Sequence, residues 1–190
     1  MAGTTKTHFI VAPVRYVKVH EQDKDMGNGG KIDFSDENGR FSLTAVLTED
    51  QKAELISNGC PEVSMGWDMF KLDKEGNPTY NFKRPHTHKK MRDRKTNERV
   101  VFGAPDVFDM DKSMAAWKEA GEGELRDHLV MWDREQDGII WNGSVCKIKY
   151  SVYKGDKDVT VIRLESVAVL ELAAKPTQDA ETTAPEDAYF

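Results

Sequence analysis

The 190-residue sequence contains only two cysteines and no long hydrophobic run. Cys60 precedes a proline and Cys146 lies in an apolar stretch, so we expect reduced thiols rather than a disulfide framework. No stretch of about 18 apolar residues is present, which excludes a membrane-spanning helix. Residues 1–9 lack the apolar core of a signal peptide. These absences predict a cytoplasmic protein that has no membrane partner.

The sequence also lacks the usual signatures of an active site. It has no nucleophile elbow and no glycine-rich loop followed by a phosphate-binding lysine. His86 and His88 have metal-like spacing, but no third ligand completes a site and cationic neighbours repel a metal. Asp106, Asp109 and Asp111 could form a nuclease centre, but they precede a predicted helix, where aspartate favours capping. We therefore expect neither an enzyme nor a cofactor.

Hydrophobic periodicity predicts a mainly β protein. Phe41, Leu43 and Ala45 alternate with polar residues, as in a half-buried strand. Thr48 to Gln51 resembles a capping box that starts a helix. Strands are predicted over 7–19, 40–47, 67–72, 78–83, 129–132, 144–153 and 159–172, and helices over 48–58 and 111–120. Many strands joined by long connections fit a small barrel better than a βαβ sheet.

The last 18 residues, 173–190, have a different composition from the rest of the chain. They hold one lysine against four acids, two prolines and an aromatic pair at the end. This composition predicts a disordered acidic tail after a domain that spans residues 1–172. Basic, aromatic-lined surfaces are the natural targets of such a tail. The residues that we expect to contact a partner or the chain's own basic surface are Asp179, Glu181, Glu186, Asp187, Tyr189 and Phe190.

Residues 83–99 concentrate positive charge in a chain whose net charge is −6. This basic segment holds eight Lys and Arg residues against two acids, and aromatic residues flank it on both sides. One interpretation is a solvated loop with the aromatic side chains in the core. The other is a surface for single-stranded nucleic acid, where cations follow phosphates and rings stack on bases. Lys147 and Lys149 share a strand face and add a second cationic row.

Three stretches resemble the single-stranded DNA-binding proteins of T7-like bacteriophages. Residues 143–152 and 163–173 are similar to the final hairpin of that family. Asn81 to Arg84 with Asp93 to Glu98 resemble its F-K strand and D-K-K-T turn, and the acidic tail ends in Phe190. A weaker similarity covers residues 39–59. The insertion over about 104–137 has no counterpart, and either widens a binding surface or packs as a flap.

The resemblance implies an OB-fold, a five-stranded barrel that coats single-stranded DNA without sequence preference during replication and recombination. It also implies that the tail competes with DNA and recruits phage or host replication proteins. The protein is expected to be a homodimer and to work in the cytoplasm of an infected bacterium. Alternation places Tyr150 on the same face as Ile148 and Val152, so both a core and a cleft position remain open. The expected single-stranded DNA-binding residues are Trp67, Tyr80, Phe82, Lys83, Arg84, Lys89, Lys90, Arg92, Arg94, Lys95, Lys147, Lys149 and Tyr150.

An alternative hypothesis uses the same barrel in another way. A cationic surface does not by itself distinguish single-stranded from double-stranded DNA. The chain could therefore be a replication or recombination accessory module that also binds duplex DNA or acts mainly through protein contacts. A comparison of single-stranded and duplex probes at equal salt discriminates between the two.

Overall fold

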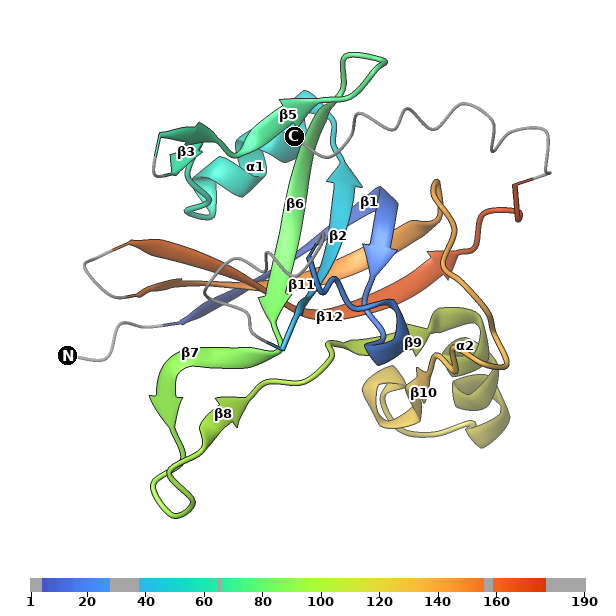
Figure 1. Ribbon diagram of the computed structural model, residues 1–190. Coiled ribbons are helices and arrows are strands. Elements are labelled where there is room, and N and C mark those ends of the chain that lie inside the picture. Colours follow the sequence, from blue (N-terminus) through green and yellow to red (C-terminus); the bar gives the residue numbers. More distant parts are fainter. Residues whose placement is uncertain (1–4, 28–37, 65, 156–158, 177–190) are drawn as a thin grey trace.

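The computed structural model describes residues 5–27, 38–64, 66–155 and 159–176 and confirms the predicted mainly β fold (Figure 1). The helices are η1 (Glu21–Asp23), α1 (Glu49–Ser57), α2 (Met110–Ala120) and η3 (Leu125–His128). The first strands are β1 (Lys6–Lys18), β2 (Arg40–Val46), β3 (Val63–Ser64), β4 (Trp67–Asp68), β5 (Phe70–Leu72) and β6 (Pro78–Pro85). They are followed by β7 (Thr87–Arg92), β8 (Arg99–Val101), β9 (Asp106–Asp109), β10 (Val130–Met131), β11 (Val145–Lys154) and β12 (Thr160–Glu171).

One eight-stranded sheet organises the molecule, in the order β10-β9-β12-β11-β1-β2-β6-β5. The long strand β1 pairs with β11 along its first half and with β2 along its second half. Neighbouring strands are antiparallel except β9 and β12, which are parallel. Because β1 belongs to both halves, the sheet curls and its two halves cross (Figure 1).

The curled sheet approaches the predicted five-stranded barrel but stays open. The five strands are β12, β11, β1, β2 and β6, and the two outer ones are not paired with each other. Instead, the Arg84 guanidinium from β6 donates to the main-chain oxygen of Leu164 on β12 at 3.2 Å. A side chain therefore bridges the seam where a closed barrel has a ladder of main-chain hydrogen bonds.

The inward-facing residues of the five barrel strands form the core. Ile10, Val14, Leu43, Ile148 and Leu164 are among those buried to 5% exposure or less. The alternation read from the sequence therefore assigns the core face of β2 and β11 correctly. Each such side chain contributes about 1.5–3 kcal/mol through removal from water.

Helix α1 begins where the capping box predicts. The Thr48 hydroxyl accepts from the Gln51 backbone N–H at 3.2 Å, and the Gln51 side-chain oxygen accepts from the Thr48 backbone N–H at 2.9 Å. The Gln51 amide nitrogen also donates to the Val11 carbonyl at 2.7 Å, which fixes α1 beside β1. Leu55 is buried and attaches the helix to the core.

Two parts of the chain extend beyond the barrel. The basic segment forms the hairpin β7–β8, which projects from the end of β6 (Figure 1). The 104–137 insertion contains β9, α2, η3 and β10, and adds two strands to the main sheet. None of the helices in the described parts of the chain is long and apolar enough to cross a lipid bilayer.

Candidate nucleic-acid interface

Two rows of side chains cross the face of the sheet that points away from the core, and we call this surface the outer face. Residues paired across neighbouring strands point to the same side of a sheet. The first row consists of Val11, Lys147, Ala168, Phe108 and Met131. The second consists of Phe9, Lys149, Ser166 and Asp106. The row between them, Ile10, Ile148, Val167 and Val107, is buried.

The outer face combines cations with an exposed aromatic ring. The Lys147 Nζ lies 5.0 Å from the centre of the Phe9 ring, which is 50% exposed. Lys149 lies directly opposite Phe9 on the paired strand. Ammonium groups beside an accessible ring can bind a phosphate and stack on an unpaired base at neighbouring points. Lys147 and Lys149 are thus placed together on one accessible face.

The insertion widens this sheet rather than lying over it as a flap. Phe108 of β9 pairs with Ala168, and Met131 of β10 pairs with Phe108. Met131 is exposed and Phe108 is half-buried. The outer face therefore continues over β9 and β10, whose place beside β12 was not predicted from the sequence.

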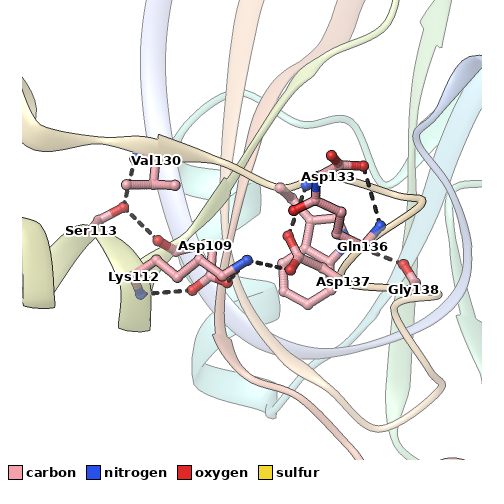
Figure 2. A network of polar contacts seen from close by, with 9 residues as sticks. Asp109, Lys112, Ser113, Val130, Asp133, Gln136, Asp137 and Gly138 are labelled. Carbon is pink, nitrogen blue, oxygen red and sulfur yellow. Dashed lines mark hydrogen bonds and ion pairs between the residues drawn. The ribbon is translucent and has the colours of Figure 1, made fainter.

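A polar network holds the insertion in place (Figure 2). The Asp109 carboxylate caps α2 by accepting from the Lys112 backbone N–H at 2.9 Å. The Lys112 ammonium in turn contacts the Asp137 carboxylate. Arg134 makes two hydrogen bonds to the Asp23 carboxylate, at 2.9 and 3.2 Å, which ties the insertion to the segment after β1. These contacts fix the position of β9 and β10 relative to the barrel.

A pocket of about 180 Å³ lies between the insertion and β12. Its lining includes Asp109, Asp111 and Asp137, with Trp132 and apolar residues at the end of β12 and just after it. Three carboxylates repel phosphate, so this pocket does not fit a nucleic acid strand. The outer face carries charge of the opposite sign, from Lys147 and Lys149.

The hairpin β7–β8 presents most of the predicted cationic residues. The side chains of Lys90, Arg92, Arg94 and Lys95 are exposed, and the backbone of Lys89 lies in β7. Arg92 donates to the Asn97 carbonyl at 2.8 Å, and Asp93 accepts from the Lys95 and Thr96 backbone N–H groups, which holds the turn. These hydrogen bonds hold the pKa of the exposed Asp93 carboxyl below its usual value.

The base of this hairpin joins the barrel through aromatic stacking. The Arg163 guanidinium of β12 lies 4.7 Å from the centre of the Phe102 ring and 5.7 Å from that of Tyr153. Phe102 also packs edge-on against His88 of β7. The basic hairpin and the strand β12 are therefore connected by a stacked arginine.

The prediction that Arg84 lines a DNA path is wrong in this structure. Its side chain is 13% exposed and donates to the carbonyls of Phe102, Gly103 and Leu164, at 2.8, 2.9 and 3.2 Å. It also pairs with the Glu165 carboxylate at 3.0 Å. With its donors already engaged within the protein, Arg84 holds the barrel seam together and is not available to a phosphate.

Tyr80, Phe82 and Tyr150 were predicted to contact DNA, and this is also wrong because all three are at most 1% exposed. Their rings pack in series, with centres 4.8 Å apart for Tyr80 and Phe82 and 5.1 Å apart for Phe82 and Tyr150. Burial raises the pKa of the Tyr150 hydroxyl to about 12. The alternative left open for Tyr150 is thus decided in favour of the core.

Replacement of Tyr150 by phenylalanine tests its structural role. The Tyr150 hydroxyl accepts from the Asn58 side-chain amide at 3.1 Å. Loss of this partly buried hydrogen bond is expected to lower the free energy of unfolding by about 1 kcal/mol. Urea denaturation measures that change, and affinity for single-stranded DNA should stay the same. A loss of affinity at unchanged stability contradicts the core assignment.

Trp67 and Lys83 are both exposed but lie apart from one another. Trp67 is 77% exposed on β4, in the small β3–β4 sheet beside α1 and away from the β7–β8 hairpin (Figure 1), whereas Lys83 lies near the end of β6, from which that hairpin projects. The eight residues of β6 span about 25 Å. The structure therefore does not bring Trp67 beside the basic hairpin. The six tail residues predicted to contact a partner lie outside the described residues.

The two alternatives with metal-site chemistry receive no support from the side-chain geometry. Nδ1 of His88 accepts from the backbone N–H groups of Lys90 and Met91, whereas Nε2 of His86 faces Glu21 at 3.4 Å. Asp109 caps α2, as its position in the sequence predicts. In the parts of the chain that the structure describes, no group of three His, Cys, Asp or Glu side chains could hold a metal ion.

Several residues of the outer face were missed in the sequence. Phe9 and Val11 carry a signal, since they alternate with Ile10 and Ala12, which are buried. Phe108 carries none, because its position depends on the pairing of β9 with a strand about 60 residues further along the chain.

The fold has a counterpart among solved structures. No family model matches the chain, and no curated protein does. The crystal structure of gp2.5, a single-stranded DNA-binding protein encoded by bacteriophage T7, matches with a TM-score of 0.52 and 18% sequence identity. The match covers 100% of this chain and 98% of that chain. This chain has the fold of a bacteriophage single-stranded DNA-binding protein. The resemblance inferred from the sequence is thereby confirmed at the level of the fold.

Proposed function

We propose that this chain is a non-sequence-specific single-stranded DNA-binding protein, without catalytic activity, and that its outer face holds the DNA. The observation that carries the proposal is the arrangement of Lys147, Lys149 and Phe9, which sets two cations beside an exposed ring on paired strands. Cations that track the backbone and rings that stack on bases are the two elements of sequence-independent binding. The fold supports the proposal from an independent direction.

A second copy of the chain is a poorer occupant of the outer face. In a two-fold symmetric contact, the same patch meets itself. The Lys147 and Lys149 side chains of the two copies then come close together, and like charges held opposite each other are destabilising. A polyanion has the complementary charge. Any homodimer is therefore expected to use another surface.

Single-stranded DNA fits better than duplex. The faces of bases are covered by neighbouring pairs in a duplex, so Phe9 can stack only on an unpaired base. The exposed cations of the β7–β8 hairpin can bind the backbone of either form. A protein that used this hairpin alone would show little preference, as the accessory-module alternative requires.

The biological role follows the family resemblance. We propose that the protein coats and protects single-stranded DNA during replication and recombination in the cytoplasm of an infected bacterium. The acidic tail competes with DNA for the cationic surface and recruits replication proteins of the phage or host, with Tyr189 and Phe190 as its aromatic anchor. The fold and the charge of the tail support this role.

A fluorescence titration tests the proposal. We expect an oligo-dT of about 20 nucleotides to quench tryptophan fluorescence, with a dissociation constant of about 1 μM or below at low salt and a steep loss of affinity as salt rises. A duplex of the same length at the same salt is the comparison. Absence of binding by both the full chain and a tail-deleted chain contradicts the proposal, and equal affinity for both probes favours the accessory module.

Deletion of residues 177–190 tests the role assigned to the tail. The deletion removes four acidic residues and no basic residue. Loss of a tethered competitor is expected to tighten binding to oligo-dT by roughly 3-fold to 10-fold at low salt, and by less at high salt. Substitution of the four acids by their amides within the full-length chain is the matched control and should have the same effect. Weaker binding after truncation contradicts self-competition.

A further inference from the structure

The strand β1 carries a line of exposed side chains along the outer face. Phe9 and Val11 are 50% and 43% exposed, and Pro13 is also exposed. The residues between them, Ile10 and Ala12, are buried. With strict alternation, Tyr16 follows the buried even-numbered residues into the core.

A β-bulge reverses the direction of Tyr16. The register of β1 against β2 shifts between Arg15 and Lys18. Tyr16 adopts a positive φ of 52° within this shift, and its side chain is 64% exposed. A bulky residue rarely takes this left-handed conformation, which glycine and asparagine adopt at lower cost. The bulge therefore brings an aromatic residue outward at a cost in conformational free energy.

Neighbouring hydrogen bonds hold the strained conformation. The Tyr16 backbone N–H donates to the Asn142 side-chain oxygen at 2.8 Å. The Val14 carbonyl accepts from the Gly143 N–H at 2.8 Å, and the Val14 N–H donates to the Ser144 carbonyl at 2.9 Å. The segment 142–144 thus fixes the backbone on both sides of the bulge. Strain maintained in this way is concentrated at functional positions in proteins.

No hydrogen bond or ring contact within the described parts of the chain stabilises the exposed Tyr16 side chain. Within the described ranges, its hydroxyl has no hydrogen bond and its ring has no aromatic or cation contact. A glycine at this position removes the strain and loses no hydrogen bond, ring contact or cation contact that those ranges contain. A contact between the exposed Tyr16 ring and a molecule outside the chain explains why this strained backbone conformation is kept.

The chemistry around Tyr16 matches an unpaired base and its phosphates. Lys18, two residues on, is 40% exposed at its side chain, and the register aligns it with Ser42 and Lys83 across β2 and β6. We propose that Tyr16 is a second base-stacking residue for single-stranded DNA, at the opposite end of the β1 line from Phe9. This inference rests on the proposed function and adds to it the path of the bound strand, from Phe9 along β1 to Tyr16.

The geometry of β1 gives the proposal a length dependence. Tyr16 lies seven positions after Phe9, which is about 23 Å of extended chain. The two rings therefore contact bases several nucleotides apart. A short oligonucleotide reaches one ring, and a long one reaches both.

The test compares Tyr16→Ala, Tyr16→Phe and Tyr16→Gly on dT₃ and dT₂₀. Tyr16→Ala is expected to weaken binding of the 20-mer by roughly 10-fold and that of the 3-mer by less than about 2-fold. Tyr16→Phe keeps the ring and should stay within about 2-fold of the parent. Tyr16→Gly should lose affinity as the alanine variant does, while its melting temperature equals or exceeds that of the parent because strain is relieved. Leu72→Ala, which removes another exposed apolar side chain, should leave both affinities unchanged.

Two outcomes overturn the assignment of Tyr16. One is unchanged affinity of Tyr16→Ala for the 20-mer while Lys147→Ala/Lys149→Ala loses affinity, which removes Tyr16 from the site and leaves the proposed function in place. The other is a large fall in the melting temperature of Tyr16→Gly, which makes Tyr16 a structural residue. Failure of the unmodified protein to bind either oligonucleotide contradicts the proposed function itself.

Discussion

Replacement of both Lys147 and Lys149 by glutamate lowers affinity for single-stranded DNA by roughly 100-fold at low salt, if the outer face holds the strand. The two lysines lie on β11 opposite Val11 and Phe9, so both point away from the core. The substitution removes two positive charges and adds two negative ones at the place where phosphates are expected. Electrophoretic mobility shift or fluorescence titration measures the loss.

The salt dependence makes the same prediction more specific. Each phosphate contact on single-stranded nucleic acid contributes about 0.7 to the slope of log K against log salt concentration. The alanine pair Lys147→Ala/Lys149→Ala is therefore expected to reduce that slope by about 1.4. A change of affinity with no change of slope contradicts direct phosphate contact.

A matched pair of lysines controls for net charge. Lys71 and Lys74 are exposed near the turn between β5 and β6, on the opposite side of β2 from β11. Their reversal to glutamate changes the net charge of the protein by the same amount and should cost less than about 5-fold in affinity. Equal losses for the two pairs mean that overall charge, and not the outer face, determines binding.

Replacement of Arg84 by alanine lowers the free energy of unfolding by about 3 kcal/mol, because it leaves several partly buried carbonyl groups without their donor. Arg84 bridges β6 to β12 at the open seam and binds the Phe102 and Gly103 carbonyls at the base of the β7–β8 hairpin. Removal of the guanidinium leaves these carbonyls without their donor. The Glu165 carboxylate keeps its contact with Arg163 at 2.8 Å, so the loss is partly compensated there.

The adjacent Lys83 provides the control. Its side chain is exposed on the other face of β6, so Lys83→Ala should change the free energy of unfolding by less than about 0.5 kcal/mol. Guanidinium denaturation of the two variants separates a structural arginine from a surface cation. If Arg84→Ala keeps its stability and loses DNA affinity, the DNA contact that the family resemblance implies for Arg84 is correct after all.

Local pattern was sufficient to predict much of the barrel. Alternation in β2 and β11 identified Leu43 and Ile148 as core residues, and the Thr48 capping box located the start of α1. These features depend on residues close together in the chain. The mainly β class follows from them, and so does the shared face of Lys147 and Lys149.

Features that depend on distant partners could not be predicted. Arg84 looked like one more cation in a basic segment, because its partners Leu164 and Glu165 lie about 80 residues away. Phe82 looked like a stacking residue for the same reason, since only the folded sheet brings it against Tyr150. Tyr16 illustrates another limit, because a single bulge reverses the face that alternation assigns.

Ultraviolet cross-linking of the full-length protein to oligo-dT, followed by peptide mapping, tests the central claim most directly. If the outer face holds single-stranded DNA, cross-linked peptides come from β1, with Phe9 and Tyr16 as the modified aromatic residues, and from β11 around Lys147 and Lys149. Cross-links confined to the β7–β8 hairpin or to the Trp67 region, with β1 and β11 unmodified, contradict it.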